Sequence, residues 1–362
     1  MDLSYYCTTS QFKYAVLAVT TTASYLILLG SAGKVPGVIV FGDSSVDAGN
    51  NNQISTVLKS NFRPYGRDFF GGRPTGRFSN GRIPPDFISE ALGLRPFVPA
   101  YLDPQFNISD FAAGVCFASA GTGFDNATSN VLNVIPLWQE LEYYKEYQKK
   151  LVAYAGEQKA KDIINESLYI ISVGTNDFLE NYYTLPRTRS KYKSIVQFQD
   201  FLIGMAEKFV RELHGLGARK MSLTGLPPMG CLPLERARNY VNGNGDGCFD
   251  GYNVVALHFN QKLNGLAEKM NGELEGIRVV FSNPYDVFMD IVKKPSQFGF
   301  DVASVACCAT GVFEMGYLCD QMNPFTCSDA SKYVFWDSFH PTQKTSSIVV
   351  DYMMKHSLHE FL

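Results

Sequence analysis

Short apolar runs recur along the chain, and each ends in a glycine or another turn-forming residue. The first, "PGVIVFG", is rich in β-branched residues, which is typical of a buried strand. Four later runs repeat this pattern, although the run "GVCFAS" is weaker. We predict five strands, at residues 36–42, 114–119, 167–174, 219–225 and 277–283.

Longer stretches with helical character separate these runs. The stretch "IPLWQELEYYKEYQKKLVAYAG" begins with a proline and ends with a glycine, the usual punctuation of a helix. The clearest helices are predicted at residues 135–156, 198–217, 252–270 and 342–356. Strands that alternate with helices indicate one parallel sheet covered on both faces. In such a sheet the site lies at the carboxyl ends of the strands, so the residues that follow each strand are the candidates for chemistry.

The N-terminal segment has a different pattern. Lys13 precedes an apolar run that is diluted by three threonines and ends in Gly30-Ser31-Ala32. A basic residue, an apolar core and an exit of small residues are the features of a secretory signal peptide. A transmembrane anchor is the alternative, but it needs about 20 solidly apolar residues, and the solid core here is short. We predict a signal peptide at 1–32, a single mature domain at 33–362 without a membrane span, and a secreted, extracellular protein.

The bulk composition narrows the class of protein further. The chain has 362 residues, of which 46% are hydrophobic and 19% are charged, enough apolar material for a sizeable core. Its formal net charge is -3, and no stripe of Lys and Arg is interleaved with aromatic residues. Nucleic-acid binding depends on such positive surfaces, so we expect no nucleic-acid partner.

Cysteine use supports export. Six of the cysteines lie after residue 230, where they can form disulfides in an oxidising compartment. We predict that Cys231 pairs with Cys248 and that Cys116 stays free. Four more cysteines are predicted to form two bridges, in which the first two, being adjacent, have different partners to avoid strain: Cys307, Cys308, Cys319 and Cys327. The chain has no C-x-x-C pair or Cys/His cluster, so no metal site is expected.

Three Asn-x-Ser/Thr sequons, at Asn107, Asn126 and Asn165, are candidate glycosylation sites in the same compartment. Sequons are frequent by chance, so they add only a little weight to the prediction of export.

Candidate reactive groups follow the first three predicted strands. Ser44, in "FGDSSVDAGNNN", lies two residues beyond the first strand, where its hydroxyl would project into a cleft. Gly121, in "ASAGTGF", allows close approach of the backbone, and Asn176, in "VGTNDFLENYY", offers an amide donor. Such N–H groups are what the oxyanion of an acyl-transfer reaction needs. Each motif alone is also ordinary turn chemistry, so the prediction rests on their combination.

The stretch "YVFWDSFHPT" places Asp337 three residues before His340. His340 can take the proton of a serine hydroxyl and return it to a leaving alcohol, while Asp337 accepts a hydrogen bond from the other ring nitrogen. The pair alone supplies too few ligands for a metal site. We therefore predict a catalytic triad of Ser44, His340 and Asp337.

Four sequence blocks, "FGDSSVDAGNNN", "FASAGTG", "VGTNDF" and "YVFWDSFHPT", resemble in this order the motif blocks of the plant GDSL esterase/lipase family, which is part of the SGNH hydrolases. The resemblance covers nearly all of the chain after the signal peptide and includes "GLPPMGCLP" and "ACCATG". It implies an α/β protein with a three-layer α/β/α flavodoxin-like fold, a central five-stranded parallel sheet, and ester hydrolysis without a cofactor.

By motif position, the resemblance implies a role for each candidate residue. Ser44 is the nucleophile and also donates its backbone N–H to the oxyanion hole. Gly121 donates its backbone N–H, and Asn176 donates its side chain. His340 is the base, with Asp337 as its partner.

Two positions depart from the family pattern. Ser45 replaces the leucine of the family's name, but the side chain there has no catalytic role. Cys116 stands where relatives usually carry asparagine, so it is expected to perturb the second-block loop or to leave a free thiol.

These observations together predict a secreted serine esterase or lipase that acts on the carboxylic ester of a small molecule, a lipid or an acylated carbohydrate. An acyltransferase that uses the same acyl-enzyme is one alternative. A catalytically idle cell-wall or carbohydrate-binding protein is another, although the intact candidate residues argue against it.

Overall fold

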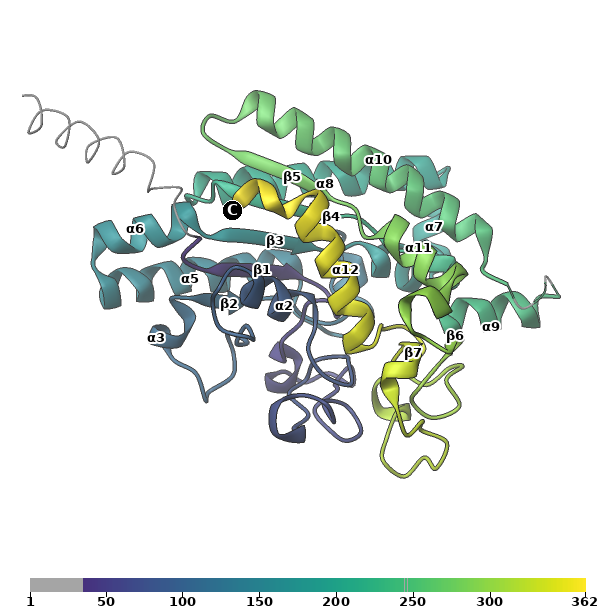
Figure 1. Cartoon of the computed structure of the whole chain (residues 1–362). Helices are drawn as coiled ribbons and strands as arrows, with labels where there is room; N and C mark the ends of the chain where they lie inside the picture. The colour runs from purple at the N-terminus through teal and green to yellow at the C-terminus, as the bar shows by residue number, and fades with distance from the viewer. Residues whose placement is uncertain (1–34, 244, 246) are drawn as a thin grey trace, which may run out of the picture. The chain divides into compact units, whose positions relative to one another are not determined.

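A parallel sheet of five strands forms the centre of the molecule, in the order β2-β1-β3-β4-β5 (Figure 1). The computed structural model describes residues 35–243, 245 and 247–362, so the predicted signal peptide lies outside the described residues. The strands are β1 (Val38–Gly42), β2 (Gly114–Cys116), β3 (Leu168–Ser172), β4 (Lys220–Thr224) and β5 (Arg278–Ser282). All five predicted strands are therefore confirmed, although β2 ends three residues earlier than expected.

Helices cover both faces of this sheet, because its strands carry apolar side chains on both sides. They are α2 (Pro84–Ala91), α3 (Ile108–Phe111), α4 (Asn126–Val131), α5 (Leu137–Ala155), α6 (Glu157–Glu166), α7 (Pro186–Lys191), α8 (Ile195–Gly215), α9 (Pro233–Val241), α10 (Asp250–Glu273), α11 (Tyr285–Lys293) and α12 (Gln343–His356). The four clearest predicted helices correspond to α5, α8, α10 and α12.

The alternation of side chains along β1 and β3 separates the two helical layers. The ring of Phe41 contacts Tyr144 of α5 and Phe209 of α8, with centroids 5.6 Å and 5.3 Å apart. Ile170 of β3 pairs with Val40, the neighbour of Phe41, so its side chain points to the opposite face of the sheet. There it borders a pocket with α2, α11 and α12. In Figure 1 the yellow helix α12 crosses the near side of the sheet beside α2. This is the three-layer α/β/α arrangement that was predicted.

A second, two-stranded parallel sheet was not predicted. It pairs β6 (Val302–Ala306) with β7 (Tyr333–Phe335), and its register is irregular. The sequence of β6, "VASVA", is not a continuous run of large apolar residues and is mostly not buried, and β7 has only three residues, so both leave little signal in the sequence. A separate apolar cluster packs beside this sheet around Tyr65, Phe78 and Trp336.

Three disulfides lie in the C-terminal half of the chain. They join Cys231 to Cys248, Cys307 to Cys327, and Cys308 to Cys319. The adjacent cysteines 307 and 308 thus have different partners, as expected, and Cys116 is free and buried.

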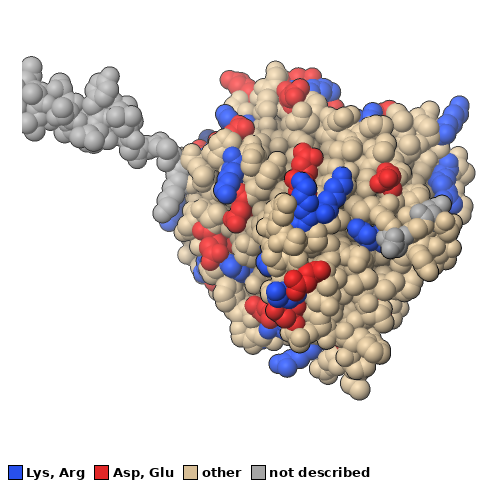
Figure 2. Space-filling view, turned by 45° about the vertical axis from the view of Figure 1, so that its right-hand side comes forward, with Lys and Arg blue, Asp and Glu red and all other residues tan. Residues whose placement is uncertain are grey.

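The described surface carries charges of both signs. On the face shown in Figure 2, basic and acidic side chains are interspersed among wide neutral areas, and neither sign forms a continuous patch. Within residues 35–362, apart from the two undescribed positions, no helix has the length and apolar character needed to cross a membrane.

Candidate active site

The nucleophile candidate lies on a tight turn at the carboxyl end of β1. Gly42, the last residue of the strand, has a φ of +141°, and a Cβ built there would lie 1.9 Å from the carbonyl oxygen of Ser172. The chain turns at once, since the N–H groups of Val46 and Asp47 both donate to the carbonyl of Asp43. Glycine at position 42 therefore permits the turn that presents Ser44 at the edge of the sheet.

His340 and Asp337 reach the same point from the turn between β7 and α12. The Nε2 atom of His340 lies 2.8 Å from the Oγ of Ser44. On the other side of the ring, Nδ1 lies 2.8 Å and 2.9 Å from the two carboxylate oxygens of Asp337. The structure thus brings together the three side chains of the predicted triad, although 296 positions separate Ser44 from His340.

Asp337 is completely buried and has further donors besides the histidine ring. The backbone N–H groups of Phe339 and His340 donate to its Oδ1 atom at 2.9 Å and 2.7 Å. The hydroxyl of Tyr65 donates to Oδ2 at 2.6 Å. Burial, followed by the nearby charge of Asp337, raises the pKa of Tyr65 well above its usual value, so this hydroxyl keeps its proton. Tyr65 was not among the predicted site residues.

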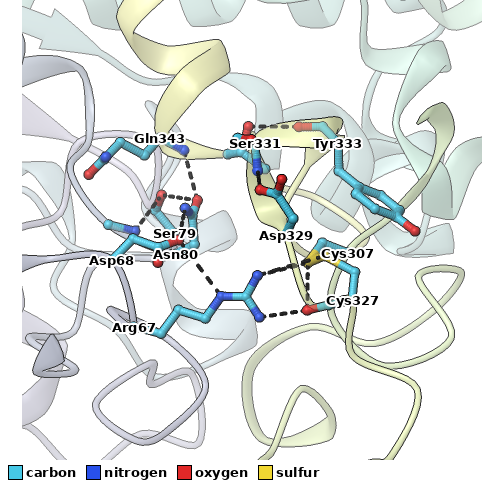
Figure 3. Close-up of polar contacts among 12 residues, drawn as sticks. Arg67, Asp68, Ser79, Asn80, Cys307, Cys327, Asp329, Ser331, Tyr333 and Gln343 are labelled. Atoms are coloured by element: carbon cyan, nitrogen blue, oxygen red, sulfur yellow. Dashed lines mark hydrogen bonds and ion pairs between the residues drawn. A yellow bond between two sulfur atoms is a disulfide. The ribbon is translucent and has the colours of Figure 1, made fainter. Parts of the chain in front are cut away.

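The loop that carries Tyr65 is tied to the C-terminal segment at several points (Figure 3). Arg67 donates to the carbonyl oxygen of Cys327 at 2.7 Å, next to the Cys307–Cys327 disulfide. Asn80 accepts from the N–H of Gln343, the first residue of α12, at 2.8 Å. These contacts hold the loop against the turn that presents His340.

The oxyanion candidates come from the next two strands. Asn176 precedes a π-helical turn, η3 (Asp177–Tyr182), and its amide nitrogen donates to the carbonyl of Thr122 at 3.0 Å, which leaves its second N–H available. Gly121, with a φ of +89°, directly precedes Thr122. Within the described part of the chain, the backbone N–H groups of Ser44 and Gly121 have no hydrogen-bond acceptor.

Ser44, Asn176 and His340 line one pocket, with a volume of about 120 Å³. Gly121 is not part of its wall but lies in the loop that Asn176 holds. Most of the wall is apolar, and its apolar side chains are Val46, Pro84, Ile88, Ile170, Val173, Leu226, Pro227, Leu232, Pro284, Phe288, Phe339, Pro341, Val349 and Met353. The polar triad therefore opens into an apolar cavity, an arrangement able to cleave an ester that carries an apolar group.

Comparison with known proteins agrees with this geometry. Residues 38–353 match the GDSL-like lipase/acylhydrolase family. The chain belongs to this family. It is 62% identical to the Arabidopsis thaliana GDSL esterase/lipase At2g04570 over 94% of this chain and 98% of that protein. A second Arabidopsis GDSL esterase/lipase, At4g26790, is also 62% identical, over 96% of this chain and 98% of the relative.

The two departures from the GDSL pattern, Ser45 and Cys116, both form hydrogen bonds with neighbouring residues. The Ser45 hydroxyl donates to Asp43 at 2.7 Å and lies 3.0 Å from the hydroxyl of Ser172, so it bonds to these two residues rather than to His340. The Cys116 thiol donates to the carbonyl of Val46 at 3.2 Å, which ties β2 to the loop after Ser44. Burial raises the pKa of Cys116, so the free thiol stays protonated.

Sequence reasoning missed the buried polar residues that join the first two GDSL blocks. Asp47 accepts from the N–H groups of Gly49, Asn50 and Ala120 at 2.7 to 3.0 Å. Asn50 in turn donates to the carbonyls of Cys116 and Ala118. The dense polar run "DAGNNN" directly after a buried strand was the available signal, because such residues satisfy backbone groups in turns. They hold Ser44 and the Gly121 loop in one rigid unit.

Glu140 of α5 was also missed. Its side chain is completely buried, and one carboxyl oxygen accepts from the N–H of Gly42 at 3.0 Å. Among the described residues, the other oxygen has no hydrogen-bond partner of normal geometry, although Thr122 lies nearby. Burial raises the pKa of Glu140 well above its usual value, which favours the neutral form of the carboxyl group that supports the strand leading to Ser44.

Two further predictions concern metals and glycans. In the part of the chain that the structure describes, no group of three His, Cys, Asp or Glu side chains is arranged to hold a metal ion. Among the sequons, Asn107 and Asn126 are exposed, while Asn165 is half-buried near the end of α6. Asn107 also caps α3, since its Oδ1 accepts from the N–H of Ser109 at 2.9 Å. Glycosylation stays a prediction at all three positions.

Proposed function

We propose that this protein is a secreted serine esterase that cleaves carboxylic esters through an acyl-enzyme on Ser44. His340 removes the proton of the Ser44 hydroxyl as the oxygen attacks the ester carbonyl, and it then protonates the departing alcohol. Water, deprotonated by His340, attacks the acyl-enzyme, releases the acid and restores the serine. Asp337 holds the histidine ring in the tautomer that this proton transfer needs.

The observation that carries this proposal is a continuous series of hydrogen bonds from Asp337 through His340 to Ser44. The Oδ1–Nδ1 and Nε2–Oγ distances are both 2.8 Å. Membership of the GDSL family adds that the chain is a carboxylic ester hydrolase. The three disulfides support a secreted protein, since such bonds persist in oxidising compartments.

The negative charge on the tetrahedral intermediate needs N–H donors. We assign this role to the backbone N–H groups of Ser44 and Gly121 and to the side chain of Asn176. The absence of an internal acceptor for these two backbone groups, among the described residues, supports the assignment.

An acyltransferase would form the same acyl-enzyme and pass the acyl group to a sugar or lipid alcohol instead of water. Product analysis with added alcohols separates the two reactions. A catalytically idle binding protein would not react with a serine-directed phosphonate at all.

The decisive experiment is ester turnover by Ser44→Ala, with Ser45→Ala as the matched control. Removing the nucleophile is expected to lower kcat by about 10⁶-fold and to abolish phosphonate labelling. Ser45→Ala should stay within about tenfold of wild type, because its hydroxyl contacts Asp43 rather than the base. EDTA should have no effect on wild type. If folded Ser44→Ala kept more than a few per cent of activity, the triad would be wrong.

A further inference from the structure

The pocket next to Ser44 has a long apolar wall that the triad does not use. Ile88 of α2, Phe288 of α11, and Val349 and Met353 of α12 all line it, and each is at most 6% exposed. Ile170 closes it on the side of the sheet. This part of the wall is therefore made of packed helices and a strand of the core.

Along α12 the lining residues are Ser346, Val349 and Met353, which have the spacing i, i+3, i+7 of one helical face. With a rise of 1.5 Å per residue, this stripe runs roughly 10 Å along the helix. Ser346 is the first of them after His340, so the stripe leads away from the reacting atoms. An aliphatic chain can follow such an apolar stripe along the helix, whereas a polar group would find few partners there.

The order of the chemical steps decides which part of an ester occupies this space. The alcohol must depart after the first step, whereas the acyl group stays attached to Ser44 until water arrives. A pocket walled by buried side chains suits the acyl group, because this group need not leave before the acyl-enzyme is hydrolysed. Resting on the proposed ester hydrolysis, we infer that this pocket binds a linear aliphatic acyl chain and that Val349 and Met353 set the chain length accepted.

The inference predicts how rate depends on chain length. Each methylene that enters the pocket should raise kcat/KM about fourfold, which corresponds to the ~0.8 kcal/mol gained by burying one CH₂. For p-nitrophenyl esters, octanoate has four more methylenes than butanoate and should therefore exceed it by roughly 250-fold in wild type. A series with one acyl group and alcohols of increasing length should show no comparable rise.

The test narrows the pocket with Val349→Phe. We expect kcat/KM on octanoate to fall at least about 30-fold while acetate turnover stays within about twofold, because only the longer chain reaches this position. Met353→Phe, four residues further along the helix, should spare butanoate and affect the longer esters. The matched control is Ile348→Phe, the neighbouring residue on α12 that does not line the pocket. It should keep the wild-type chain-length profile.

Each outcome has one meaning. If the wild-type protein hydrolysed none of the esters, acetate included, the proposed hydrolase function itself would be rejected. Three results would overturn the acyl-pocket inference alone. The first is turnover that does not rise with acyl length, and the second is a rise with alcohol length instead. The third is an equal chain-length profile for Val349→Phe and Ile348→Phe. If Val349→Phe does not fold, Val349→Ala serves as the second variant: widening the pocket should shift the preference toward longer or branched chains, and an unchanged profile would count against the inference.

Discussion

The two halves of the candidate site support their reactive groups in different ways. On the C-terminal side, the carboxylate of Asp337 receives hydrogen bonds from the His340 ring, two backbone N–H groups and Tyr65. On the sheet side, Glu140 receives one, from Gly42, at the end of the strand that leads to Ser44. Both carboxyl groups are completely buried.

This difference indicates what each carboxyl group does. The many donors around Asp337 suit a group that acts as an acceptor toward the base throughout the reaction. The single donor to Glu140 does not offset the cost of burying a charge, so burial favours the neutral form of this group, which contacts the backbone. Substitutions that remove a carboxylate charge or a hydrogen-bond donor, on the C-terminal side or on the sheet side, test whether the two sides differ in this way.

Among the variants that compare the two sides, the largest effect is expected from Asp337→Asn. The amide has nearly the same shape, but it favours the wrong tautomer of His340, so kcat should fall by about 10⁴-fold. The measurement is steady-state ester hydrolysis, with Asp351→Asn on the exposed face of α12 as the control. A folded Asp337→Asn enzyme with near wild-type kcat would mean that the carboxylate has no part in orienting the base.

A smaller loss is expected from Asn176→Ala on the sheet side. This change leaves the triad intact and removes one donor to the oxyanion, so kcat should fall about 10² to 10³-fold with little change in KM. Asn264→Ala, an exposed position on α10, is the control. A rise in KM with unchanged kcat would instead assign Asn176 to substrate binding.

The smallest effect on rate is expected from Glu140→Gln. The amide can still accept from the N–H of Gly42, so kcat should stay within about twofold of wild type, whereas Glu140→Ala leaves that N–H unpaired and should cost about 1–3 kcal/mol of stability. Glu140→Gln also replaces a carboxyl group that titrates with an amide that does not. The raised pKa of Glu140 means that wild type loses stability as pH rises above the ordinary value of 4.5 toward the folded value.

Urea unfolding at pH 5 and pH 8 tests whether stability falls with pH in this way. The free energy of unfolding of Glu140→Gln, relative to wild type, should increase with pH, while Glu142→Gln on the exposed face of α5 should show no such trend. A relative stability of Glu140→Gln that fell between pH 5 and pH 8 would show instead that the pKa of Glu140 is lowered in the folded protein.

Much of the fold could be predicted from local patterns. The apolar runs that became β1, β3, β4 and β5 are continuous because a parallel sheet is buried on both faces, and such runs are visible in a single sequence. The weak run at β2 was recognised but its end was placed too late. Strand β6 was missed because it is mostly not buried and lacks a continuous apolar run, and β7 because it has only three residues and pairs irregularly.

The sequence by itself determined the five strands of the central sheet, the long helices, the order of the four motif blocks and the spacing of Asp337 and His340, because each depends on residues close together in the chain. Only the tertiary structure decided which buried polar groups serve the site. Tyr65 reaches Asp337 across 272 positions, and Glu140 reaches Gly42 across 98. A tyrosine or a glutamate looks the same in a sequence whether it is exposed or buried, and packing between distant segments alone settles its partners and its charge. The acyl pocket has the same origin, since α2, α11 and α12 form its wall only when they meet on one face of the sheet.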